Sequence, residues 1–157
     1  MTVSESTQKD LIKWCILKSQ ITVIHNGVKQ LGNIKLLQKS KEKILIYLGA
    51  ISKDKGIEDA LKAFALIVQK EDDWQFWIVG ISDSRYLKYL KVISKKLGID
   101  RKIKFWGFVT ENKKYELLAK ACLLINPSIR EGWGLVVIEA ASVGTPTVGY
   151  DVSGLRD

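Results

Sequence analysis

The chain has 157 residues, of which 46% are hydrophobic and 27% are charged. These proportions are typical of a globular protein and exclude a disordered chain or a collagen-like repeat, and the length fits about one domain. The 25 lysine and arginine residues against 17 acidic residues give a formal net charge of +8. This excess favours an anionic partner, and nucleic acid, phosphate esters and anionic lipid surfaces are all compatible with it.

The N-terminal part of the chain predicts a short helix, a strand and a linker. Apolar residues recur at helical spacing around Leu11 and Ile12 and from Trp14 to Leu17. The segment ITVIHNGV, residues 21–28, alternates β-branched residues and stops at the turn-forming pair Asn26-Gly27, which predicts a strand and a turn. Residues 29–43 are rich in lysine, glutamine and asparagine and predict a linker at a domain boundary.

Beyond this linker, strands and helices are expected to alternate. Short apolar runs predict strands at KILIYLG (43–49), WQFWIVG (74–80), IKFWG (103–107), CLLINPS (122–128) and TVGY (147–150). Helical spacing predicts helices over 56–70, from a cap at Ser84 to a stop at Gly98, from a cap at Thr110 through Ala121, and over 135–143. Alternating strands and helices with short connections predict an α/β fold, a parallel sheet covered by helices on both faces.

A ligand site is expected in the loops that follow the strands. In open parallel sheets, ligands bind outside the carboxyl ends of the strands, where the N-termini of helices supply partial positive charge. Four loops of this kind connect a predicted strand to a predicted helix: residues 49–56, 80–84, 107–110 and 127–134.

The last of these loops carries a pair of glutamates. Glu131 lies between glycines in the sequence EGWGL, and Glu139 follows eight residues later on the next predicted helix. Gly132 and Gly134 allow the backbone to approach a ligand, and the N–H groups at a helix start suit a phosphate or a sugar hydroxyl. Taken alone, the two carboxylates also fit a solvated helix, so the flanking motifs decide between these interpretations.

The segment EGWGLVVIE resembles the motif of two glutamates separated by seven residues in retaining glycosyltransferases of family four, which have the GT-B fold. Further similarity lies, in order, at HNGV (25–28), YLG to DKG (47–56), WIVG (77–80), IKFWGFV (103–109), NPS (126–128) and SGLRD (153–157). The resemblance covers nearly the whole chain. It is to the C-terminal, nucleotide-sugar-binding half of such enzymes, a Rossmann-like domain.

This resemblance implies a role for each matching residue in binding a nucleoside diphosphate sugar, linked to UDP or GDP. Glu139 matches the ligand of the ribose hydroxyls, Glu131 the carboxylate near the transferred sugar, and Lys55 the cation that neutralises the leaving diphosphate. Further donor-binding positions are Gly132, Trp133, Gly134 and Leu135 in the loop, Phe108 and Val109 around the base, and Gly49, Lys53 and Gly80 after the first two strands. The implied reaction is hexosyl transfer to an acceptor hydroxyl with retention of configuration and without a cofactor or bound metal.

The chain departs from the family pattern in two ways. Ala50 follows Gly49, where the family usually has an arginine that helps to clamp the diphosphate. Residues 1–28 resemble the end of an acceptor-binding N-terminal domain, and the family continues beyond SGLRD with a further strand and helices. We therefore expect residues 44–157 to form a donor-binding domain that lacks its last elements, and the fragment alone to be inactive without the acceptor domain.

Alternatives from other classes are weaker. His25 is the only histidine, which disfavours a histidine-based metal site, and neither a nicotinamide fingerprint nor a P-loop is present. A GT-B sugar-nucleotide epimerase fits the motif less well. The rival is a non-catalytic basic module that docks a partner chain or a membrane surface. Its support is a run of basic residues that lies largely on one predicted helix and the segment after it. The alternative interpretation of this run is a solvated helix face. That run comprises Arg85, Lys88, Lys91, Lys95, Lys96, Arg101, Lys102 and Lys104.

The remaining features bear on location and packing. Cys122 lies in the apolar run AKACLLI, which predicts a buried, inert thiol and a reducing compartment. The sequence has no apolar run of about 18 residues and no signal-like N-terminus, so we expect a cytoplasmic protein with a peripheral membrane contact or a lipid-linked acceptor as further partners, and no nucleic acid. The five tryptophans are expected in the core or at a domain interface, with Trp133 alone in a site loop.

Overall fold

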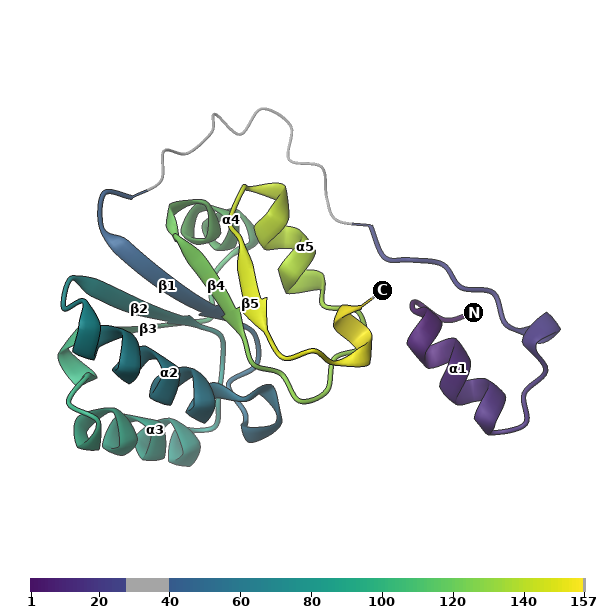
Figure 1. Cartoon of the computed structure of the whole chain (residues 1–157), viewed down its shortest axis with the longest axis horizontal. Coiled ribbons are helices and arrows are strands. Elements are labelled where there is room, and N and C mark those ends of the chain that lie inside the picture. Colours follow the sequence, from purple (N-terminus) through teal and green to yellow (C-terminus); the bar gives the residue numbers. More distant parts are fainter. Residues whose placement is uncertain (28–39, 157) are drawn as a thin grey trace.

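A computed structural model describes residues 1–27 and 40–156. Residues 43–149 contain a five-stranded, all-parallel sheet in the order β3-β2-β1-β4-β5 (Figure 1). The strands are β1 (Lys43–Leu48), β2 (Trp74–Val79), β3 (Ile103–Gly107), β4 (Leu123–Asn126) and β5 (Thr147–Gly149). All five predicted strands and the predicted α/β class are therefore confirmed.

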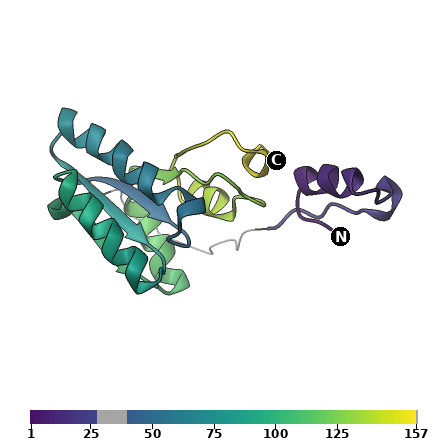
Figure 2. The same cartoon turned by 90° about the horizontal axis from the view of Figure 1, so that it is seen from below.

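Helices cover both faces of this sheet (Figures 1 and 2). They are α2 (Ile57–Lys70), α3 (Ser84–Lys96), α4 (Glu111–Lys120) and α5 (Leu135–Ser142). Along β1, Leu45 and Tyr47 pack with α2 and α3, whereas Ile44 and Ile46 pack with α4 and α5. Since side chains alternate between the faces of a strand, burial on both sides explains why the strands are continuous apolar runs rather than alternating ones.

The start of α3 corrects one predicted cap. Asp83, not Ser84, is the N-cap, because its Oδ1 accepts the backbone N–H groups of Arg85 and Tyr86 at 2.8 and 3.0 Å. The two residues are adjacent and both are good caps, so only the backbone geometry distinguishes them. The predicted cap of α4 is confirmed, since Thr110 Oγ1 accepts the N–H of Lys113.

The N-terminal segment differs more from its prediction. Its helix α1 spans Glu5–Lys13, capped by Ser4, so residues 14–17 lie outside it. The strand predicted over 21–28 is wrong for the described residues 21–27, which form only an isolated bridge between Val23 and Thr2. A β-strand needs a continuous partner, and the two-residue contact is too short to provide one. The predicted linker spans residues 29–43. Its residues 29–39 lie outside the described ranges, and its last residue, Lys43, begins β1.

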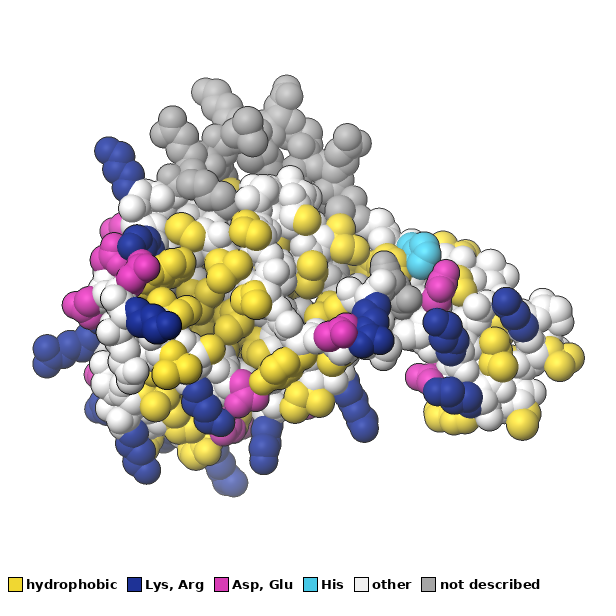
Figure 3. Space-filling model, viewed as in Figure 1, with side chains coloured by type: hydrophobic (Ala, Val, Ile, Leu, Met, Phe, Trp, Pro, Cys, Tyr) yellow, Lys and Arg dark blue, Asp and Glu magenta, His cyan; other side chains and the backbone are white. Residues whose placement is uncertain are grey.

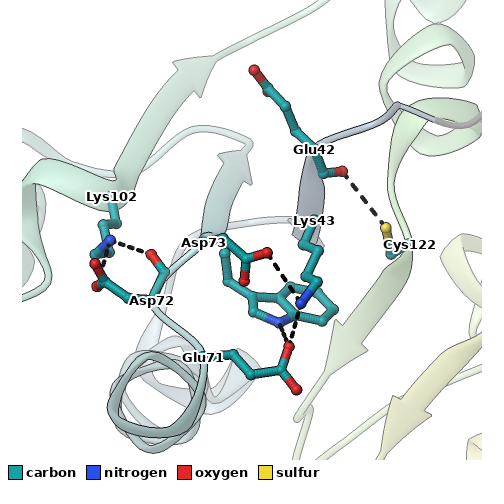
Figure 4. A network of polar contacts seen from close by, with 8 residues as sticks. Glu42, Lys43, Glu71, Asp72, Asp73, Lys102 and Cys122 are labelled. Carbon is teal, nitrogen blue, oxygen red and sulfur yellow. Dashed lines mark hydrogen bonds and ion pairs between the residues drawn. The ribbon is translucent and has the colours of Figure 1, made fainter.

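The prediction of a buried Cys122 needs correction, and one tryptophan lies outside the core. Cys122 is half-buried rather than buried, and its Sγ lies 3.8 Å from the carbonyl oxygen of Glu42 (Figure 4). Trp14 is 78% exposed, unlike the buried Trp77. Within the described ranges, no helix combines the length and the apolar character needed to cross a membrane.

The start of α2 is held against the loop after β4 by a close backbone approach at Gly56. A Cβ built there would lie 2.0 Å from the carbonyl oxygen of Pro127, and the φ angle of Gly56 is +70°. We expect Gly56→Ala to lower the free energy of unfolding by about 2 kcal/mol, because it adds a clash to the cost of a left-handed backbone. Gly98 is the matched control: its φ is also +70°, but open space surrounds it.

Urea unfolding of the two alanine variants separates the two costs. Gly98→Ala should lose only about 1 kcal/mol, the backbone cost alone. Equal losses in both variants would contradict the close approach between α2 and the loop after β4.

At the opposite edge of the sheet, charged side chains join the amino ends of the strands (Figure 4). The Lys43 ammonium lies 2.5 Å from Glu71 and 3.1 Å from Asp73, and Lys102 pairs with Asp72 at 2.7 Å. Hydrogen bonds, first from Lys43 and then from the Trp74 indole, lower the pKa of Glu71. These pairs tie the starts of β1 and β2 to the end of α2.

This lowered pKa predicts a pH dependence of stability. A carboxylate whose pKa is lower in the folded state stabilises fully above its unfolded pKa and loses that contribution as the pH falls through its folded pKa. We therefore expect the free energy of unfolding of Glu71→Gln to fall less steeply than that of the wild type between about pH 5 and pH 3. Glu42→Gln is the control, because that carboxylate points away from Lys43 (Figure 4). Parallel curves for the wild type and Glu71→Gln would contradict the prediction.

Candidate functional site

A cavity of about 310 Å³ opens at the carboxyl ends of β1, β2 and β3. It brings together four of the predicted donor-binding residues: Gly49, Gly80, Phe108 and Val109. Its other lining residues are apolar except Lys114, and Ala50 is among them. An apolar cavity of this size with one charged group at its wall has the properties of a small-molecule site.

Lys114 connects the cavity to Glu139. Its ammonium lies 2.7 Å from the carboxylate of Glu139 on α5 and 2.7 Å from that of Glu111. Burial lowers the pKa of Lys114, but the hydrogen bonds to Glu111 and Glu139 outweigh this effect, so its pKa lies above the ordinary value. The ammonium therefore stays charged at neutral pH, and Glu139, 14% exposed, is held at the edge of the cavity.

Sequence reasoning missed Lys114. The one signal available was its place in the first turn of the helix that follows the third strand, where a side chain can reach the carboxyl edge of the sheet. Four lysines occur between residues 102 and 114, so this position did not stand out from its neighbours.

Lys55 and Glu131 form a second charged pair. Lys55 Nζ lies 3.0 Å from Glu131 Oε2 and 3.3 Å from the carbonyl oxygen of Arg130, and the two side chains are 28% and 19% exposed. The backbone supports this contact, since the Ile129 N–H donates to the Asp54 carbonyl at 3.2 Å. The sheet order explains the meeting, because β1 and β4 are neighbours and the loops that follow them share one edge.

The Glu131 loop, defined here as residues 130–134, is backed by the last turn of the described chain, Ser153–Leu155 (η4). A Cβ on Gly154 would lie 1.8 Å from the carbonyl oxygen of Glu131, so the two backbones are in direct contact. Gly134 caps α5, and the first N–H groups of a helix have no partner within the helix. The N–H group of Leu135, the first residue of α5, therefore has no partner within the helix and can meet an anion or a hydroxyl.

Trp133 does not line the cavity, and its ring contacts the N-terminal segment. Its ring stacks on His25 with 4.5 Å between the ring centroids and an interplanar angle of 20°. This contact brings a residue of the N-terminal segment to a predicted site residue. Of the other predicted site residues, Lys53 is exposed on a short 3-10 turn and Gly132 is exposed in the loop.

The basic run is divided between paired and exposed residues. Lys102 is paired with Asp72, and the Lys104 ammonium lies 3.9 Å from the ring centroid of Trp106. Five basic residues on α3 are exposed, namely Arg85, Lys88, Lys91, Lys95 and Lys96. Figure 3 shows basic side chains projecting along the lower edge of the molecule, where α3 lies. In the part of the chain that the structure describes, no group of three or more histidine, cysteine, aspartate or glutamate side chains could hold a metal ion.

Comparison with known proteins gives consistent matches. The family described as glycosyl transferases group 1 matches residues 30–157. An uncharacterized glycosyltransferase of Methanocaldococcus jannaschii is 29% identical and aligns with 100% of this chain, which spans 43% of that protein. N-acetyl-alpha-D-glucosaminyl L-malate synthase of Bacillus anthracis is 35% identical over 74% of this chain and 29% of its own length. The chain thus spans less than half the length of these relatives.

Solved structures share the fold. HepE of Anabaena, in complex with UDP and glucose, superposes with a TM-score of 0.83 at 23% sequence identity, covering 99% of this chain and 45% of that one. TarM of S. aureus, whose complex contains UDP, gives a TM-score of 0.81 at 23% identity, covering 96% of this chain and 29% of that one.

Proposed function

Because this chain belongs to the glycosyl transferases of group 1, we propose that it binds the nucleoside diphosphate sugar donor of a retaining hexosyltransferase. The observation that carries the proposal is that two charged pairs, Lys114–Glu139 and Lys55–Glu131, lie at the carboxyl ends of the strands, the same edge of the sheet at which the apolar cavity opens. UDP is bound in the solved HepE structure, which supports a nucleotide as the ligand class.

Each part of the site suits one part of such a donor. The apolar cavity, with Gly49, Gly80, Phe108 and Val109 in its wall, accepts the base. Glu139 at its edge accepts hydrogen bonds from the ribose hydroxyls, and these charge-assisted bonds are among the stronger ones. The remaining donor-binding residues, Gly132, Trp133, Gly134, Leu135 and Lys53, surround the diphosphate and the sugar.

The chemical step needs charge stabilisation more than acid or base groups. The bond between the anomeric carbon and the donor phosphate oxygen breaks, and its electron pair leaves with the diphosphate. The acceptor hydroxyl oxygen bonds to the same carbon on the same face, and the hydroxyl proton passes to the departing phosphate oxygen. Lys55 offsets the charge that develops on the diphosphate, with the helix-start N–H groups of α5. Glu131, paired with Lys55, orients the hydroxyls of the transferred sugar.

The Ala50 position leaves this site with one cation fewer than the family usually has. Ala50 lines the cavity without adding charge, and Lys53 is an exposed cation within the same loop. We therefore infer weak binding of the diphosphate, with Lys55 as the principal cation. Transfer itself requires an acceptor site, which we assign to the larger part of such enzymes that this chain does not span.

Calorimetric titration of the folded chain with UDP, GDP and their sugars tests the proposal. We expect heat with at least one nucleoside diphosphate and none with the free sugars. The absence of heat with every nucleotide would overturn it. In that case, salt-sensitive sedimentation with anionic vesicles would favour the basic module instead, for which the exposed α3 face with Tyr89 and Val92 between its cations is the specific observation.

A further inference from the structure

Trp133 is the one aromatic side chain of the Glu131 loop, and a hydrogen bond does not fix its ring. Its indole N–H is buried and has no hydrogen-bond partner among the described residues. The ring contact that the structure shows is the stack on His25, from a segment 108 positions earlier in the sequence. The orientation of the indole therefore depends on where His25 is held.

His25 is held by a small network within residues 1–25. Its Nδ1 lies 3.3 Å from the carbonyl oxygen of Val3, which can only accept, so Nδ1 carries the proton. Two backbone hydrogen bonds join the segments of chain around it: the Thr2 N–H donates to the Thr22 carbonyl, and the Ile24 N–H donates to the Thr2 carbonyl at 2.8 Å. These bonds fix the backbone just before the imidazole.

The same segment contacts the Glu131 loop by a second route. The helix α1 packs against η4, whose Gly154 backs the carbonyl oxygen of Glu131 (Figures 1 and 2). The loop is thus restrained from one side by Lys55 and from the other by His25 and η4. Loss of the imidazole would remove the restraint on the Trp133 side of the loop without changing the Lys55–Glu131 pair.

We propose that His25 is a positioning residue for donor binding: it holds Trp133 and through it the backbone N–H groups that follow Glu131. This inference rests on the proposed function for its effect on nucleotide affinity, but the effect on the loop is independent of any ligand. The stack, not the imidazole proton, is the active feature, because the indole offers His25 its ring face. A flat aromatic side chain at position 25 should therefore serve as well.

Hydrogen–deuterium exchange of the 157-residue chain tests the positioning directly. In His25→Ala, we expect amides of residues 130–136 to exchange about three- to tenfold faster, the effect of losing one aromatic stack. His25→Phe should restore the wild-type rate. Trp14→Ala is the matched control, an exposed aromatic of the same segment, and should change nothing in the loop. Amides of β1 serve as the internal standard.

Three results would overturn the proposal: unchanged exchange in His25→Ala, a His25→Phe variant as fast as the alanine, or an equal rise in β1. Affinity for the nucleotide that the wild type binds should fall by the same three- to tenfold in His25→Ala and recover in His25→Phe. If the wild type binds no nucleotide, the proposed function fails, while the exchange rates still decide whether His25 positions the loop.

Discussion

Replacing Glu139 by glutamine is expected to weaken binding of the nucleoside diphosphate about 100-fold. The carboxylate is held at the cavity edge, and losing its charge removes the two charge-assisted hydrogen bonds that we propose to the ribose, each worth about 1.5–3 kcal/mol before any compensation. Titration calorimetry of the variant against the wild type measures the loss. Thermal unfolding of both proteins verifies that the variant remains folded.

Glu111→Gln is the matched control for this prediction. Glu111 contacts the same Lys114 ammonium at the same distance, 2.7 Å, but its side chain is 57% exposed. The control should bind within about twofold of the wild type, because an exposed ion pair contributes little. Equal losses in the two variants would show that Glu139 acts only through Lys114 and would contradict its role as a ribose ligand.

Replacing Lys55 by methionine is expected to weaken UDP binding about 30-fold while leaving uridine binding unchanged. Lys55 is the cation that we assign to the diphosphate, and methionine keeps the apolar stem of the side chain while removing the charge. Calorimetry with UDP and uridine separates the phosphate contribution from that of the base. If an acceptor site is supplied and transfer proceeds as proposed, the same substitution should slow it about 1000-fold, because the charge on the leaving diphosphate develops in the transition state.

Two further variants make this prediction specific. Lys62→Met removes a cation from α2 that is paired with Asp59, and it should bind UDP normally. Glu131→Gln removes the carboxylate that competes with phosphate for Lys55, so its UDP affinity should rise about threefold. Equal losses of UDP affinity in Lys62→Met and Lys55→Met would show that the effect depends only on net charge.

Local patterns predicted much of the fold. Short apolar runs, three of them ended by glycine, located all five strands, and helical spacing with its caps and stops located the four helices around the sheet. These patterns are reliable because each depends on neighbouring residues and on burial of a strand on both faces. The predictions were wrong where local signals compete, as at Asp83 and Ser84, or where a strand-like pattern lacked a partner, as at residues 21–27.

The sequence by itself determined the α/β class, the loops that carry the site and the motif of Glu131 and Glu139. Only the tertiary structure decided which charges meet. The order β3-β2-β1-β4-β5 places the loops after β1 and β4 side by side, which joins Lys55 to Glu131. Packing of α4 on α5 joins Lys114 to Glu139, and the N-terminal segment brings His25 to Trp133. The two members of each pair are distant along the chain, so no local sequence pattern predicts their contact. The contact follows from strand order and packing alone.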